Sequence, residues 1–126
     1  MSSRTTLAFA CLMGFLAVIL GAFGAHALKN HLSAVQLAIY ETGVRYQMFH
    51  VFALLAAGLG GSKGDLKILG RASFAFAAGI VIFSGSLYAL VFSGVRLWGA
   101  VTPVGGILLM AGWIFMGIAF WKGNKS

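Results

Sequence analysis

Residues 41–50 read ETGVRYQMFH and bring polar side chains into the opening of an otherwise apolar segment. The uncharged run that follows, residues 51–61, is too short to cross a bilayer alone, because a transmembrane helix needs about 20 residues. Counting back about 20 residues from Gly61 reaches Thr42. A span of that length holds Arg45 just inside the hydrocarbon with Glu41 at its rim, so we expect any functional site to lie in this stretch.

The composition is that of an integral membrane protein. The chain has 126 residues, of which 60% are hydrophobic and 9% are charged, and its mean hydropathy is +0.97. Soluble domains carry about 25% charged residues. The stretches without formal charge are close to the length of one helical span, and they cover residues 5–28, 46–62, 72–95 and 97–121.

These stretches predict an all-α fold, a polytopic bundle of four transmembrane helices. A single domain of this kind takes up the whole chain, residues 1–126, and leaves no room for a soluble domain. The predicted spans cover residues 6–28, 42–61, 72–92 and 102–121.

The cations are distributed unevenly between the two ends of such a bundle. One end carries Arg4, Lys63, Lys67, Arg71, Lys122 and Lys125, and the other carries Lys29, Arg45 and Arg96. By the positive-inside rule, the richer end, with both termini and the middle loop, faces the cytoplasm. The net charge of +7 therefore indicates a lipid bilayer as partner, and not a nucleic acid.

The first span also has features of a secretory signal peptide. Arg4 precedes the apolar run 7–23, and residues 25–27, Ala-His-Ala, resemble a cleavage site. The run is longer than the usual apolar region of a signal peptide and further spans follow it, so we favour an uncleaved helix. Cys11 has no second cysteine to pair with, and we interpret it as a small core residue of this span.

Small residues at helical spacing predict close contacts between helices. Ala17, Gly21 and Ala25 follow one another at intervals of four in the first span. In the fourth span, Gly105 and Gly112 lie on the same side as Leu109 and Met116. The glycines that we expect in helix contacts are Gly14, Gly21, Gly24, Gly105 and Gly112.

Two positions have the features of helix starts. Ser33 is a suitable N-cap for a helix that begins at Ala34 and continues into the second span without a break. Thr102 and Pro103 match an N-cap and the first residue of a helix, which predicts that the fourth span begins there.

The second and third spans carry polar groups that are costly in a membrane. Glu41 and Arg45 are four residues apart and share one face of a helix as an oppositely charged pair. An arginine costs at least ~2.5 kcal/mol at the centre of a bilayer, so such residues mark candidate functional sites. The third-span serines either bond to a helix carbonyl or line a polar crevice. The candidate functional cluster is His26, Glu41, Arg45, Gln47, His50, Ser84, Ser86 and Tyr88.

Four segments have a more specific pattern than composition alone provides. They are residues 21–28 (GAFGAHAL), 41–50 (ETGVRYQMFH), 83–88 (FSGSLY) and 102–106 (TPVGG). Together they resemble the domain of unknown function 423 family, small bacterial inner-membrane proteins with similar small transmembrane proteins in eukaryotes. The resemblance covers essentially the whole chain and implies four transmembrane helices in the inner membrane with an uncleaved first helix. It supplies neither an activity nor functional residues.

The residues favour a non-enzymatic module that assembles with itself or with a larger membrane complex. In this interpretation Glu41, Arg45 and His26 tie the outer ends of the helices together. The alternative is a small oligomeric transporter or channel that uses Glu41, Arg45, Gln47 and His50. We predict no catalytic residue, cofactor or metal, because three histidines and one cysteine offer no convergent set of ligands.

Overall fold

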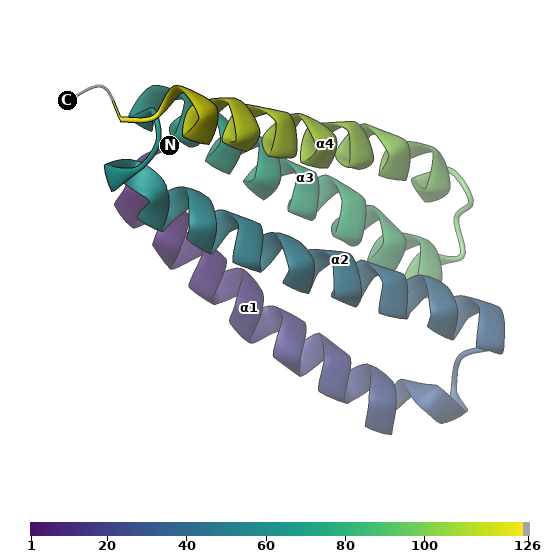
Figure 1. Cartoon of the computed structure of the whole chain (residues 1–126). Coiled ribbons are helices and arrows are strands. Elements are labelled where there is room, and N and C mark those ends of the chain that lie inside the picture. The colour runs from purple at the N-terminus through teal and green to yellow at the C-terminus, as the bar shows by residue number, and fades with distance from the viewer. Residues whose placement is uncertain (125–126) are drawn as a thin grey trace.

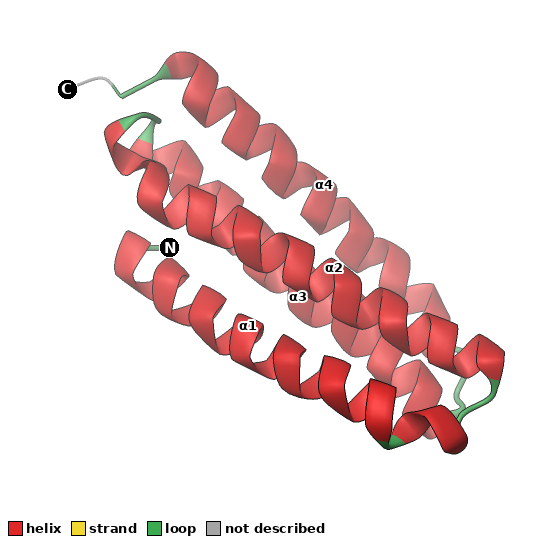
Figure 2. Cartoon of the chain, turned by 60° about the horizontal axis from the view of Figure 1, so that its bottom comes forward, coloured by secondary structure: helices red, strands yellow, loops and turns green. Residues whose placement is uncertain are grey.

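The computed structural model describes residues 1–124 as four helices joined by short turns (Figure 1). Consecutive helices pack side by side, so α1 and α4 lie at opposite edges in both views (Figures 1 and 2). This arrangement confirms the predicted all-α fold. The helices are α1 (Ser3–His26), α2 (Ala34–Leu59), α3 (Leu66–Ser93) and α4 (Trp98–Lys122), with single 3-10 turns at Leu28–Asn30 and Gly60–Ser62.

Three of these helices, α1, α3 and α4, are long and apolar enough to cross a membrane. α2 has a comparable length of 26 residues, but the polar residues 41–50 interrupt its apolar surface. Membrane insertion is therefore supported for three helices, and a fourth crossing by α2 stays a prediction.

The predicted start of α2 is confirmed. The Ser33 side chain accepts a hydrogen bond from the backbone of Gln36, and the Gln36 side chain accepts one from the backbone of Ser33. This reciprocal capping satisfies two backbone N–H groups that a helix start leaves free. From there α2 continues without a break to Leu59, as expected.

α3 starts at Leu66, six residues before the predicted third span over residues 72–92. Asp65 caps the helix, since its Oδ1 accepts from the backbone N–H groups of Lys67 at 3.0 Å and Ile68 at 3.1 Å. At the other end, α3 is followed by Gly94, whose φ of 70° lies in the left-handed region that glycine adopts without strain.

The predicted start of the fourth helix is wrong. α4 begins at Trp98, and Pro103 lies inside it. Thr102 does not cap the helix, because its hydroxyl donates back to the Trp98 carbonyl at 3.3 Å. A proline inside a helix lacks an N–H and its ring crowds the carbonyl four residues earlier, so the turn before Pro103 forms despite a local cost. Tight bonds close this first turn, such as Gly99 N–H to the Arg96 carbonyl at 3.0 Å.

The core lies where α2, α3 and α4 meet, with a small contribution from α1. Cys11 does not belong to it: the side chain is exposed, so its expected core position is wrong. The reason is that α1 packs mainly against α2 and leaves most of its surface outside the bundle. The core is built from Ala10, Val51, Ala53, Leu54, Ala57, Leu69, Ala72, Phe76, Ala77, Ile80, Leu109, Met116 and Ala119.

The two ends of the bundle separate the charges as the sequence predicts. Met1 and the C-terminal end of α4 lie at the end that also holds the Gly60–Ser62 turn (Figure 1), where the Asp65 N–H donates to the Ala119 carbonyl at 3.1 Å. We call this the basic end; its described cations are Arg4, Lys63, Lys67, Arg71 and Lys122, and Lys125 lies outside the described residues. Its assignment to the cytoplasm stays a prediction.

Candidate functional site

The polar residues of α2 make this helix the centre of the bundle. Within residues 1–124, every side-chain hydrogen bond between helices involves α2 except the one that joins Ser86 to Thr102. The least apolar helix is therefore the one that is bonded to all three others. In a membrane such bonds replace the water that the polar groups lose.

Gln47 joins three helices through its side-chain amide. Its Nε2 donates to the Met13 carbonyl of α1 at 2.8 Å, and its Oε1 accepts from the Tyr88 hydroxyl of α3 at 2.8 Å. The residue is buried, with 3% of its surface exposed. Both ends of the amide are thus used, and this geometry fixes which end is the oxygen.

Gly43 lets α3 approach α2 closely, one turn from Gln47. A Cβ at this position would lie 2.8 Å from Cε1 of Tyr88, closer than real atoms approach. The buried carbonyl of Gly43 accepts a hydrogen bond from Ser84 Oγ at 2.6 Å. Ser84 therefore bonds to a carbonyl of a neighbouring helix, which is the first of the two alternatives given for the third-span serines.

Tyr40 bonds the N-terminal part of α2 to α1. Its hydroxyl donates to the Leu20 carbonyl of α1, and its ring packs where Gly24 leaves space. The ring also contacts Tyr88, with centroids 5.6 Å apart. This tyrosine was not among the predicted site residues.

His50 is held between α2 and α4 by two hydrogen bonds. Its Nδ1 lies 2.7 Å from the Tyr46 carbonyl, and its Nε2 lies 3.0 Å from Nε1 of Trp113. A carbonyl only accepts and an indole N–H only donates, so the proton sits on Nδ1 and the imidazole is neutral. Phe76 packs against both rings, at centroid distances of 5.8 Å from His50 and 5.3 Å from Trp113.

The contact between α3 and α4 depends on glycine and one hydroxyl pair. The hydroxyl oxygens of Ser86 and Thr102 lie 2.6 Å apart, at hydrogen-bond distance. A Cβ at Gly105 would lie 2.3 Å from the backbone nitrogen of Phe83, and one at Gly112 would lie 2.6 Å from the Phe76 ring. Among the other expected contact glycines, Gly24 faces Tyr40 closely, whereas Gly14 and Gly21 have ordinary contact distances of 3.4 Å and 3.6 Å.

Glu41 and Arg45 lie on the outer side of α2, away from this network. Both are exposed, and neither takes part in a side-chain hydrogen bond between helices within residues 1–124. They line a groove of about 240 Å³ between α1 and α2, which we call the α1–α2 groove. Its lining consists of Gly21, Gly24, Ala25, Tyr40, Glu41, Val44 and Arg45.

The structure thus divides the predicted cluster into five separate parts. Gln47, Ser84 and Tyr88 come together between α2 and α3, His50 joins α4, and Ser86 bonds within the α3–α4 contact. Glu41 and Arg45 share the outer groove. His26 is exposed at the end of α1. Apart from the Ser86–Thr102 pair, the side-chain hydrogen bonds between helices within residues 1–124 involve Tyr40, Gln47, Ser84 and His50. They do not involve the expected set of Glu41, Arg45 and His26.

The sequence analysis did not identify three residues whose side chains form hydrogen bonds between helices: Tyr40, Trp113 and Thr102. For Tyr40 a signal exists, because Tyr40, Gly43, Gln47, His50 and Leu54 follow one another at intervals of three and four and are all buried. This spacing marks the inner face of a helix. Trp113 and Thr102 have no comparable local signal, since their partners are 63 and 16 residues away.

The buried polar side-chain atoms of the bundle all have partners within it. No buried side-chain nitrogen or oxygen in the described part of the chain lacks a hydrogen-bond partner. Within residues 1–124 no group of three or more His, Cys, Asp or Glu residues is placed to hold a metal ion. The buried polar side chains are bonded to each other or to backbone carbonyls.

Comparison with known proteins places the chain among membrane proteins. Residues 20–106 match the family model described as "Protein of unknown function (DUF423)". The UPF0382 inner membrane protein YgdD of Escherichia coli (strain K12) is 45% identical over 116 residues, which cover 92% of this chain and 88% of that protein. A UPF0382 membrane protein of Haemophilus influenzae is 43% identical over 95% of both chains.

A UPF0382 membrane protein of Staphylococcus saprophyticus is 43% identical over 113 residues, covering 88% of this chain and 92% of that protein. No solved structure matches the chain. The family model covers more than half of the chain, and the matching segment contains all of α2 and α3. The apolar helices and these relatives agree, and the chain belongs to the DUF423 family of membrane proteins.

Proposed function

We propose that this protein is a non-enzymatic assembly module of the bacterial inner membrane, which docks a transmembrane helix of a second chain in the α1–α2 groove. The observation that carries the proposal is the division of its polar residues. The buried ones are bonded inside the bundle, while Glu41 and Arg45 remain on its outer side.

The shape of the groove supports a helix as the occupant. Gly21 and Ala25 form one wall and have no large side chains, so another backbone can approach closely there, while the Tyr40 ring fills the space beside Gly24. Glu41 and Arg45 form the other wall. In a low-dielectric environment an acid and a base one turn apart favour a partner that bears the complementary groups.

The same geometry is less suited to a transport route. The four residues that a transporter would use do not line a common cavity: Glu41 and Arg45 face the outer groove, whereas Gln47 and His50 are bonded between helices. A moving proton or solute would have to break those bonds at each step.

The test is the mass of the assembly in native lipid particles. Gly21→Leu fills the groove, and Gly117→Leu places the same side chain on a face of α4 where no atom lies within 4 Å of an added Cβ. We expect the wild type and Gly117→Leu to associate with a second copy or a larger complex and Gly21→Leu to be released as a monomer. Glu41→Gln combined with Arg45→Gln should act in the same direction without adding bulk. A wild type that is monomeric without partners, or release by neither groove variant, would refute the proposal.

A further inference from the structure

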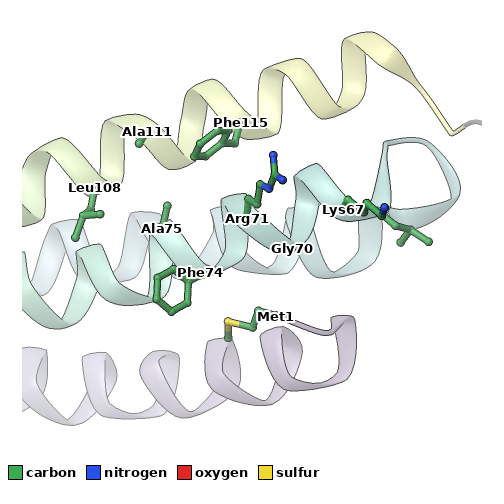
Figure 3. Close-up of a pocket in the computed structure, with 10 residues that line it drawn as sticks. Met1, Lys67, Gly70, Arg71, Phe74, Ala75, Leu108, Ala111 and Phe115 are labelled. Carbon is green, nitrogen blue, oxygen red and sulfur yellow. The ribbon is translucent and has the colours of Figure 1, made fainter.

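A second groove opens at the basic end, on the side of α3 that lies between α4 and the start of α1 (Figure 3). Its volume is about 620 Å³. In Figure 3, Lys67 lies beside the turn, Arg71 follows along α3, and Phe74 and Ala75 come next. The wall on α4 is made by Leu108, Ala111 and Phe115.

An apolar groove of about 380 Å³ continues from this one between α3 and α1. The two share Met1 and Phe74, so the exposed Phe74 ring stands where they meet. The continuation has only apolar side chains, which are Met1, Phe9, Phe74, Ala77, Ala78, Val81 and Ile82.

We propose that these two grooves bind one anionic phospholipid. Its phosphate lies at Lys67 and Arg71, one acyl chain lies along α3 and α4, and the other lies along α3 and α1 on the far side of Phe74. This site is at the opposite end of the bundle from the α1–α2 groove, so it does not depend on the proposed function.

The order of chemistry along α3 matches that of a phospholipid. Lys67 and Ala75 are eight positions apart, which corresponds to about 12 Å along a helix, and the surface changes over that distance from cationic to apolar. Cations at the interface attract anionic headgroups, and basic pockets between transmembrane helices hold them. The one acid at this end, Asp65, does not line the groove and uses its carboxylate to cap α3.

The experiment is native mass spectrometry of the full chain in detergent, titrated with phosphatidylglycerol or with phosphatidylcholine. Lys67→Gln combined with Arg71→Gln removes both cationic side chains of the groove. Lys29→Gln combined with Arg96→Gln removes the same charge from the opposite end and serves as the matched control. We expect the first pair to weaken phosphatidylglycerol binding about tenfold or more and the control pair to leave it unchanged, with little effect of either on phosphatidylcholine.

Ala111→Phe tests the apolar part without changing any charge, and remains informative if the double variant fails to fold. It should also weaken phosphatidylglycerol binding, and excess inorganic phosphate should not displace the lipid. Equal losses in both double variants would overturn the proposal in favour of general charge attraction. Complete displacement by inorganic phosphate would indicate a bare anion site, and a lipid-free dimer that Ala111→Phe dissociates would indicate that a second copy occupies the groove.

Discussion

The indole N–H of Trp113 donates to Nε2 of His50 at 3.0 Å, across 63 residues of sequence. The other imidazole nitrogen is bonded to the Tyr46 carbonyl, so the ring is neutral and carries its proton on Nδ1. A histidine held in this way connects α4 to α2 and is not available as a proton carrier unless one of the two bonds breaks. This relationship makes His50 a structural residue of the bundle.

Replacing Trp113 by Phe should destabilise the bundle by about 0.6 to 1.7 kcal/mol, the range of hydrogen bonds between membrane helices. The substitution keeps an aromatic ring against Phe76 but removes the donor to His50. Thermal unfolding in detergent measures the effect. Trp121→Phe is the control, because Trp121 is 91% exposed; equal shifts in both variants would mean that the bond contributes nothing.

Gln47 and Tyr88 should be energetically coupled. A double-mutant cycle with Gln47→Leu and Tyr88→Phe isolates their hydrogen bond of 2.8 Å. We expect a coupling energy of about 0.6 kcal/mol or more, and a larger loss for Gln47→Leu alone, because that substitution also removes the bond to the Met13 carbonyl. Strictly additive effects would show that the two side chains act independently.

Gly105→Ala should be among the most damaging single substitutions in α4. Its Cβ would lie 2.3 Å from the Phe83 backbone nitrogen, and backbone atoms cannot move aside as a side chain does. We expect a loss of about 3 kcal/mol, at the upper end for overpacking. At Gly117, where the space is open, the same substitution should be neutral or stabilise the helix by up to about 1 kcal/mol. Similar melting temperatures for the two variants would contradict this contact.

Four crossings with the basic end inside predict a definite labelling pattern. In a Cys11→Ala background, Ser62→Cys should react with an impermeant thiol reagent only from the cytoplasmic side. Asn30→Cys, in the turn after α1, and Ser93→Cys, at the last residue of α3, lie at the other end of the bundle and should react only from outside. If α2 lies on the membrane without crossing it, Asn30→Cys and Ser62→Cys will be labelled from the same side.

Proteoliposomes should show no proton flux above that of empty vesicles. The reason is that Gln47 and His50 are bonded between helices while Glu41 and Arg45 lie outside. A pH-sensitive dye inside the vesicles measures the flux. Flux in the wild type that Glu41→Gln abolishes would favour the transporter instead.

Some features follow directly from the sequence. The all-α fold and the grouping of charges at two ends depend on local quantities: long apolar runs, few charges and short turns between them. The capping box at Ser33 is also readable from neighbouring residues. The start of α4 was misjudged because Thr102 and Pro103 have the local pattern of a helix start. Here the first turn forms before the proline, and the Thr102 hydroxyl bonds to Ser86.

The sequence by itself thus determined a helical membrane protein in which α2 carries polar and charged residues that cost free energy inside a bilayer. It could do so because hydropathy and helical period are properties of neighbouring residues. Only the tertiary structure decided what those residues do. Whether Gln47 and His50 were free or bonded depended on Met13, Tyr88 and Trp113, which come from other helices. A side chain's partners across a bundle are set by helix rotation and packing. Those quantities brought Gln47 and His50 inside and left Glu41 and Arg45 on the outer face.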